Sequence, residues 1–504
     1  MRITNKMMTN NMMSNINKNK LNMTSLEQQY STGKKIQKPS EDPIIAVRAL
    51  KLRTNLTELN QYYDKNIPDA KSWMDVTESS LSNVNEMLSK INTYCIQGST
   101  DTLTAEDRAS VVANLLQLKE QVYQEGNANY AGRYVFTGYK TDSSLTFSED
   151  EPNLTYAITE NFTGKQLQVT NKVVGGYTLD DLGSSSFDDA PSLQQTYRLQ
   201  LSYDKLSAAA PTSISYTTVN SSGVEEEQSI TGITVMSLVD LETDADPTTS
   251  PDDAYRPGPG EVYYIPETGE MIFGSTVYDS MKNATNISLT YNKTGFLDGE
   301  LKPEHFFTCT KADSVSSEED ANFVKEDQQI QYEINFSQKL TINTQASTAF
   351  SHELGRSIDD ILASVNAVKE VESVITELEN RLKDTNLTDS EREEIEKMKS
   401  HMDTELSLKK DLMQKAFSKG IEVSSKEQEK LNVAVADLGS RYVRLELTED
   451  RLSSQSTDFE DLMSNNEDAD IAETIIKYSS AEAIYNASLS AAAKVVQNSL
   501  LDFL

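Results

Sequence analysis

The stretch IAETIIKYSSAEAIYNASLSAAAKVVQNSLLDFL, residues 471–504, decides the fold that we expect for this chain. Its apolar side chains recur at steps of three and four residues, with interruptions at Glu482 and Ser499. Such steps place side chains on one face of an α-helix. No glycine follows Gly439 and no proline follows Pro303, so nothing breaks that helix. An apolar stripe needs a partner, because a lone helix cannot cover it. The stripe itself leaves open whether that partner belongs to the same domain.

The opposite end of the chain offers a partner. Residues 1–32 contain no glycine or proline and are rich in Asn and Met. They carry a weak apolar stripe at Met12, Ile16, Met23, Leu26 and Tyr30. A helix of this kind is marginal until something packs on it, and methionine suits an adaptable interface. A mitochondrial presequence is also basic and amphipathic, but it favours Arg, Leu and Ser over Asn and Met.

Residues 33–43, GKKIQKPSEDP, predict a break before the next helix, with Ser40 as its N-cap and Pro43 in its first turn. A heptad repeat follows at Ile45, Ala49, Leu52, Leu56, Leu59, Tyr63, Asn66, Ala70, Trp73, Thr77, Leu81, Val84, Leu88, Ile91 and Cys95. This spacing favours coiled-coil packing, and Pro68 inside it predicts a kink or a junction between two helices. Residues 104–125 predict another helix, which can fold back on the first.

The middle of the chain has a different character. Residues 136–340 hold nine of the 12 prolines and most of the glycines, together with short alternating runs. Residues 262–273 predict a hairpin, and the whole region predicts one or two antiparallel β units. Helices resume at 350–383 and 391–415, Gly420 is expected to break the pattern, and residues 431–459 carry a further seam. The expected fold class is α+β, a coiled-coil helical shaft built from both chain ends with a central antiparallel β-rich insert.

Charge and composition exclude several classes of function. The net charge of −33 argues against nucleic acid, because phosphate binding needs Lys and Arg on the contacting face. Residues 1–38 are the exception, with seven basic side chains and one acidic one. No run of 18 apolar residues indicates a membrane span, and no apolar core of a signal peptide is visible. Two cysteines exclude a disulfide framework, so buried free thiols are expected at Cys95 and Cys309.

The sequence shows no catalytic motif. The chain has three histidines, and His352 with Glu353 forms only half of a zinc-binding HExxH pair, since Arg356 stands where the second histidine belongs. Gly164 and Lys165 lack the spacing of a phosphate loop, and no GxSxG elbow occurs. We therefore expect no enzyme, no cofactor and no metal. An enzyme would need a catalytic insert on the helical shaft.

Several segments resemble the bacterial flagellin family. They are residues 1–8 (MRITNKMM), 30–36 (YSTGKKI), 39–43 (PSEDP), 132–138 (GRYVFTG), 438–446 (LGSRYVRLE), 467–473 (EDADIAE) and 499–504 (SLLDFL). The segment at 132–138 and the C-terminal ones are similar to those of family members that join hook and filament. The likeness covers roughly residues 1–140 and 430–504. No motif matches the middle of the chain, and the charged helices around 376–415 are longer than the family usually carries.

The resemblance implies a structural component of the bacterial flagellum that forms the hook–filament junction. The alternative is flagellin, the filament subunit itself. It implies export without a cleaved signal, a homo-oligomeric ring, contacts with a neighbouring hook-associated protein and with flagellin, and an export chaperone on the C-terminal helix. No nucleic acid or membrane partner is implied. The implied location is extracellular, at the junction.

The implied domains are terminal assembly segments at 1–38 and 466–504, disordered in the monomer, a shaft at 39–140 and 341–465, and an outward-facing β-rich domain at 141–340. We expect the assembly contact to lie on both terminal segments. Its residues are Met7, Met12, Ile16 and Leu26 on one side, and Ile475, Tyr478, Tyr485, Leu489, Val496, Leu500 and Phe503 on the other.

Overall fold

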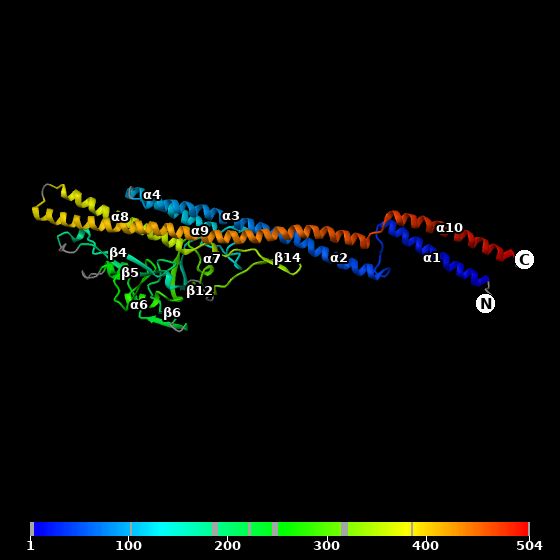
Figure 1. Ribbon diagram of the computed structural model, residues 1–504, viewed down its shortest axis with the longest axis horizontal. Helices are drawn as coiled ribbons and strands as arrows, with labels where there is room; N and C mark the ends of the chain where they lie inside the picture. Colours follow the sequence, from blue (N-terminus) through cyan, green and yellow to red (C-terminus); the bar gives the residue numbers. More distant parts are fainter. Residues whose placement is uncertain are drawn as a thin grey trace. The chain divides into compact units, whose positions relative to one another are not determined.

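The computed structural model describes residues 5–100, 103–183, 190–219, 223–243, 250–313, 321–384 and 387–501. Its helices are α1 (Asn5–Thr32), α2 (Pro43–Gln61), α3 (Ile67–Gly98), α4 (Ala105–Glu125), α5 (Leu238–Thr243), α6 (Ser275–Met281), α7 (Ala346–Ala349), α8 (His352–Leu382), α9 (Asp389–Glu467) and α10 (Ile471–Leu501). Long helices therefore come from both ends of the sequence, and the strands come from the part of the sequence between them (Figure 1). The expected α+β class is confirmed.

The strands pair with one another almost entirely in the antiparallel direction. They are β1 (Asn129–Tyr130), β2 (Arg133–Tyr134), β3 (Glu151–Phe162), β4 (Gln168–Val174), β5 (Ser192–Gln200), β6 (Ser213–Val219), β7 (Glu225–Thr231), β8 (Thr234–Val235), β9 (Val262–Ile265), β10 (Glu270–Phe273), β11 (Asn286–Phe296), β12 (Thr308–Asp313), β13 (Ala321–Phe323), β14 (Gln331–Asn335) and β15 (Gln338–Thr341). The larger sheets have the orders β4-β5-β10-β9-β8 and β13-β12-β3-β11-β6-β7. The expected hairpin is the antiparallel pair β9–β10, whereas β8 pairs with β9 in parallel.

The chain divides into two compact units. Unit 1 comprises Met1–Lys71, Tyr332–Leu340 and Val443–Leu504. Unit 2 comprises Ser72–Gln331 and Thr341–Tyr442. The long helices α3 and α9 contribute residues to both.

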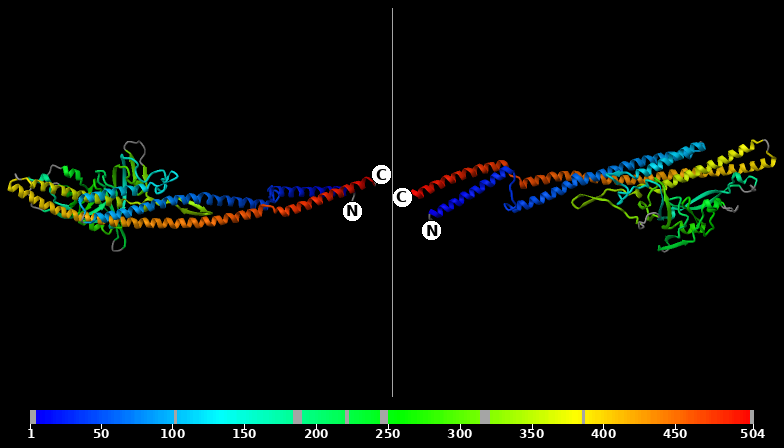
Figure 2. Two further views of the ribbon diagram at one scale, coloured as in Figure 1. Left: turned by 90° about the horizontal axis from the view of Figure 1, so that it is seen from above. Right: turned by 180° about the vertical axis from the view of Figure 1, so that it is seen from behind.

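In unit 1, α1 lies beside α10, and both chain ends lie at the same end of this pair in each view (Figures 1 and 2). The two helices are therefore antiparallel. The rest of the unit pairs α2 with the C-terminal part of α9. Arg53 of α2 binds Glu467, and Asn60 accepts a 3.2 Å hydrogen bond from Ser456.

The heptad repeat at 45–95 is confirmed as a packing stripe, since Leu59, Trp73 and Leu81 on it are fully buried. Between α2 and α3 the backbone makes a π-helical turn at Tyr62–Asn66, and Pro68 follows in the first turn of α3. The π-helical turn is the junction between two helices that the position of Pro68 in the heptad repeat predicted. In unit 1 the hairpin β14–β15 packs at this turn, where the ring of Tyr62 meets that of Phe336 edge-on.

Two expected helix boundaries are wrong. Helix α2 begins at Pro43 with Asp42, not Ser40, as its cap, because the Asp42 carboxylate accepts the amide hydrogens of Ile44 (2.9 Å) and Ile45 (3.2 Å). Gly420 does not interrupt a helix but lies inside α9.

Close packing explains why a glycine is tolerated at position 420. A Cβ atom there would lie 2.8 Å from Ile361 Cδ1 and 3.0 Å from Cys95 Sγ. The absence of a side chain lets α9 approach its neighbours closely, although glycine lowers the local helix propensity. Cys95 and Cys309 are both buried free thiols, as expected.

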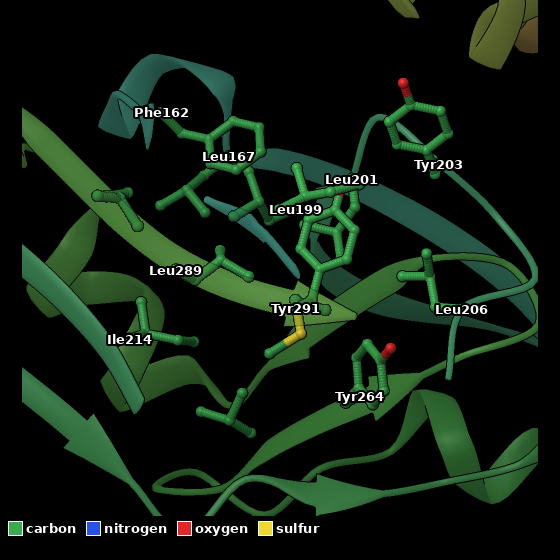
Figure 3. Close-up of a cluster of buried hydrophobic side chains, with 14 of the residues drawn as sticks. Phe162, Leu167, Leu199, Leu201, Tyr203, Leu206, Ile214, Tyr264, Leu289 and Tyr291 are labelled. Carbon is green, nitrogen blue, oxygen red and sulfur yellow. The ribbon is translucent and has the colours of Figure 1, made fainter. Parts of the chain in front are cut away.

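The two larger sheets of unit 2 share one apolar core. Leu199 of β5 and Tyr264 of β9 come from one sheet, and Leu289 and Tyr291 of β11 come from the other (Figure 3). Side chains that alternate along each strand fill the space between the sheets, which is the usual arrangement of a sandwich.

A buried ion network joins this β region to α8 within unit 2. Arg198 of β5 binds Glu270 of β10 at 2.6 Å and Asp360 of α8 at 2.8 Å. Arg198 and Glu270 are almost completely buried. Burial of charge is tolerated here because each charge has a hydrogen-bonded partner of opposite sign.

The charged helices around 376–415 form the ends of α8 and α9 that adjoin their connecting loop. They enclose a small apolar core of their own, which includes Leu378 and Met398. Tyr177 and Leu182, from the segment after β4, pack against it. The segment after β4 thus helps to cover these helix ends.

Candidate assembly interface

Helices α1 and α10 meet along one regular seam. On α1 the seam consists of Thr9, Met12, Ile16, Asn19, Met23, Leu26 and Gln29, and every other described side chain of this helix is exposed. On α10 it consists of Thr474, Tyr478, Ala481, Tyr485, Ser488 and Ala492, and the remaining described side chains of that helix are exposed too. The steps of three and four residues are those of a coiled coil.

A hydrogen-bonded polar pair lies near the middle of this seam. The side-chain amide of Asn19 donates a 3.2 Å hydrogen bond to Ser488 Oγ. Counting outwards from this pair in antiparallel order sets Met23 against Tyr485 and Ile16 against Ala492. A hydrogen-bonded polar pair in an apolar seam favours one register over its neighbours.

The outer faces of the same two helices expose large apolar side chains. On α10 these are Ile471, Ile475, Ile476, Ile484 and Leu489, and on α1 they are Met7, Met8, Met13, Leu21 and Tyr30. Among the described residues, unit 1 holds more than half of all exposed large apolar side chains, although it has less than a third of the chain. Such a concentration of exposed apolar surface is typical of an interaction site.

The predicted contact residues therefore fall into two groups. Met12, Ile16, Leu26, Tyr478 and Tyr485 lie in the seam between α1 and α10. Met7 (52% exposed), Ile475 and Leu489 (both 42% exposed) lie on the outer faces. Phe503 lies outside the described residues, and so do the side chains of Val496 and Leu500.

The bases of α1 and α10 are joined by backbone hydrogen bonds. The chain turns at residues 33–42 after α1 and at 468–470 before α10. Lys34 and Asp468 form an antiparallel bridge there. The Lys35 amide donates to the Glu467 carbonyl at 2.7 Å, and the Ala469 amide donates to the Gly33 carbonyl at 2.8 Å.

Charged side chains reinforce this connection. Arg53 binds the Glu467 carboxylate with two nitrogens, with Nε 2.8 Å from Oε1. Lys34 Nζ lies 2.5 Å from Asp468 Oδ1 and 3.5 Å from Glu467 Oε2. The hydrogen bonds from Arg53 and Lys34 lower the pKa of the Glu467 and Asp468 carboxyls, respectively. We call Lys34, Arg53, Glu467 and Asp468 the clamp.

The clamp and half of the seam were not predicted from the sequence. Glu467 is one of 79 acidic residues, so its type alone carries no signal. A signal in the sequence is that two segments between helices carry opposite charge. Residues 33–38 are basic and residues 467–470 are acidic. Thr474, Ala481 and Ser488 were missed because they are small, although they follow the same spacing as Tyr478 and Tyr485.

The N-terminal part of the chain matches a known family. Residues 3–141 match the family model of the bacterial flagellin N-terminal helical region. The resemblance to the flagellin family that the sequence motifs indicated is therefore confirmed.

Two curated relatives are named flagellar hook-associated protein 3. The protein from Escherichia coli is 29% identical over 191 residues, which cover 38% of this chain and 59% of the relative. The protein from Salmonella typhimurium is 31% identical over 145 residues, which cover 29% of this chain and 45% of the relative. The chain thus spans about half the length of each.

Among solved structures, FlgL of Xanthomonas campestris aligns with 83% of this chain and 99% of its own, at 11% identity and a TM-score of 0.30. None of the helices in the described ranges combines the length and the low charge that a bilayer-spanning segment needs. In the same ranges, no three His, Cys, Asp or Glu side chains are grouped so that they could hold a metal ion.

Proposed function

We propose that this protein is a structural component of the bacterial flagellum and forms the junction between hook and filament. The similarity to two proteins named flagellar hook-associated protein 3 supports this role. The observation that carries it is the exposed apolar surface of α1 and α10. It lies on the helices that the two chain ends build together, in a chain whose net charge of −33 otherwise opposes self-association.

In this role the outer faces of α1 and α10 are covered by neighbouring copies. Met7, Ile475 and Leu489 make contacts between copies, whereas Met12, Ile16, Leu26, Tyr478 and Tyr485 hold the pair together within one copy. We assign Val496, Leu500 and Phe503 to the continuation of α10 toward the chain end. Burial of the exposed side chains supplies the free energy that overcomes charge repulsion.

The three parts of the chain then have separate roles. Residues 1–38 and 466–504 are the assembly segments, which order fully only with neighbours present. Residues 39–140 and 341–465 are the shaft, and 141–340 stay accessible on the assembled flagellum. The copies form a ring that contacts a second hook-associated protein and flagellin, and a chaperone covers α10 before export to the extracellular flagellum. The protein has no enzymatic activity in this role.

Deletion of the gene tests the proposal. Cells that lack a junction protein should carry hooks without filaments and release flagellin into the medium. Restoring the gene should restore filaments. If the deleted gene encoded flagellin instead, filaments would also be absent, but the medium would contain no flagellin. Normal filaments in the deletion strain would contradict both roles.

A further inference from the structure

The clamp has a consequence for how the terminal helices pair. It connects four places in unit 1, namely the end of α1, the middle of α2, the end of α9 and the start of α10. Glu467 is at its centre, with a side chain only 5% exposed between Arg53 and Lys34. Two basic residues and a buried carboxylate from segments far apart in sequence thus meet at one point.

The backbone makes this point a fixed one. The Lys34–Asp468 bridge is flanked by the two short backbone hydrogen bonds of Lys35 and Ala469. Further along, the side-chain amide of Asn466 donates to the carbonyl of Ile45 at 3.1 Å. These contacts favour one register, because a slip by one residue would break both backbone hydrogen bonds of the bridge.

The helices beyond the clamp are less strongly held. Their seam is narrow, and several of its members are small or polar, among them Asn19, Ala481 and Ser488. The stretches that lead away from the clamp also expose ten large apolar side chains. Marginal helices with few buried contacts open locally before the rest of a domain does.

We propose that the clamp, with Glu467 at its centre, is the positioning site of the terminal helix pair. It holds the bases of α1 and α10 together in one register in the single chain, so that the two helices zip outward from it when neighbouring copies bind. A preformed base removes the loop-closure entropy of bringing the two chain ends together. The zipping step rests on the proposed function, whereas the clamp in the single chain does not.

Hydrogen exchange on the full-length free chain tests the clamp itself. In the wild type, the amides of Lys35 and Ala469 should exchange slowly, and amides far out on α1 and α10 should exchange faster. Glu467→Gln removes the charge between two cations and should speed exchange of the Lys35 and Ala469 amides, which we call the clamp amides, by about tenfold. The matched control Glu460→Gln, an exposed acid on the same helix, should change it by less than about twofold.

A second pair of variants guards against an effect of Glu467→Gln on folding. Arg53→Met should also speed exchange at the clamp amides, and Arg48→Met, at an exposed arginine of the same helix, should not. Wild-type clamp amides that exchange as fast as free peptide would overturn the clamp. Exchange in Glu467→Gln equal to that of wild type would overturn the role of Glu467.

Incorporation into flagella tests the zipping step. The amount of Glu467→Gln in purified flagella should fall clearly below that of Glu460→Gln at equal expression. Equal incorporation of both variants would overturn zipping from the clamp. If the wild-type protein itself is absent from flagella, the proposed function and the zipping step fail together, and the exchange result alone decides the clamp.

Discussion

Leu489→Asp is the substitution that separates the outer face of α10 from the fold of the chain. Leu489 is 42% exposed in the single chain, so less than half of its burial remains to be gained in an assembly. Full burial of a leucine is worth about 1.5–3 kcal/mol, which leaves about 1 kcal/mol for the contact between copies. An aspartate in the same contact adds the penalty of a buried unpaired charge, several kcal/mol in itself. The total of about 3–5 kcal/mol weakens each contact by at least about 100-fold.

The single chain should lose only part of its stability by this change, because Leu489 is partly covered within it. We expect its free energy of unfolding to fall by about 1–2 kcal/mol, which corresponds to the part of the leucine that is already buried. The matched control is Ser490→Asp. It adds the same charge at the next residue, which is exposed and has no large apolar side chain.

The assay compares the variant in purified flagella with the variant in the medium, alongside urea unfolding of the purified chain. Leu489→Asp should be absent from flagella, and Ser490→Asp should be incorporated. Incorporation of Leu489→Asp at the wild-type level would refute the assignment of the outer face. A large loss of stability in the free chain would instead mean that Leu489 belongs to the fold.

Three further predictions concern the shaft, the β region and the clamp. Arg198→Met leaves the buried Glu270 carboxylate without its closest cation and should destabilise unit 2 by about 3–5 kcal/mol in urea unfolding. Gly420→Val should lower the melting temperature clearly, because its side chain would overlap Cys95 and overpacking costs about 1–3 kcal/mol; an unchanged value would contradict the close approach of α9. The lowered pKa of Glu467 means that the clamp is stabilised above the ordinary carboxyl pKa of 4.5 and weakens as pH falls through the lowered value. Amide protection at the clamp, corrected for intrinsic exchange, should therefore be constant from about pH 5 to 7 and drop below about pH 4.

The helical part of the fold could be predicted because its signal is local. A heptad stripe such as that of Leu59, Trp73 and Leu81 is visible within a single segment of the sequence. Such a stripe predicts that the helix packs against a partner that buries these side chains. Residues 33–43 likewise predicted a helix boundary. The cap was assigned to Ser40 instead of Asp42 because both types suit that position and only the backbone geometry distinguishes them.

The order of the strands could not be predicted, because pairing between distant strands leaves no local trace. Strand β11 pairs with β3, more than 100 residues earlier in the chain, and β8 runs parallel to β9. Gly420 was misjudged for a related reason. From the sequence alone, a glycine predicts the end of a helix. Only the structure shows that neighbouring side chains leave no room for a larger residue at this position.

Only about half of the residues in the seam between α1 and α10 could be predicted from the sequence. Helix α10 carries large apolar side chains on more than one face, so two stripes with the same spacing coexist on it. One stripe runs through Tyr478 and Tyr485, and the other through Ile475 and Leu489. Periodicity alone cannot say which stripe meets α1, because that choice depends on how closely small residues such as Ala481 let the two helices approach.

Immunogold labelling of intact flagella distinguishes a junction protein from a filament subunit. The antibody would be raised against residues 141–340, which the proposal leaves accessible in the assembled structure. For a junction protein we expect a single cluster of label where hook meets filament, on every flagellum. Label spread along the filament would identify the chain as a filament subunit, and label confined to the cell body would contradict a flagellar role altogether.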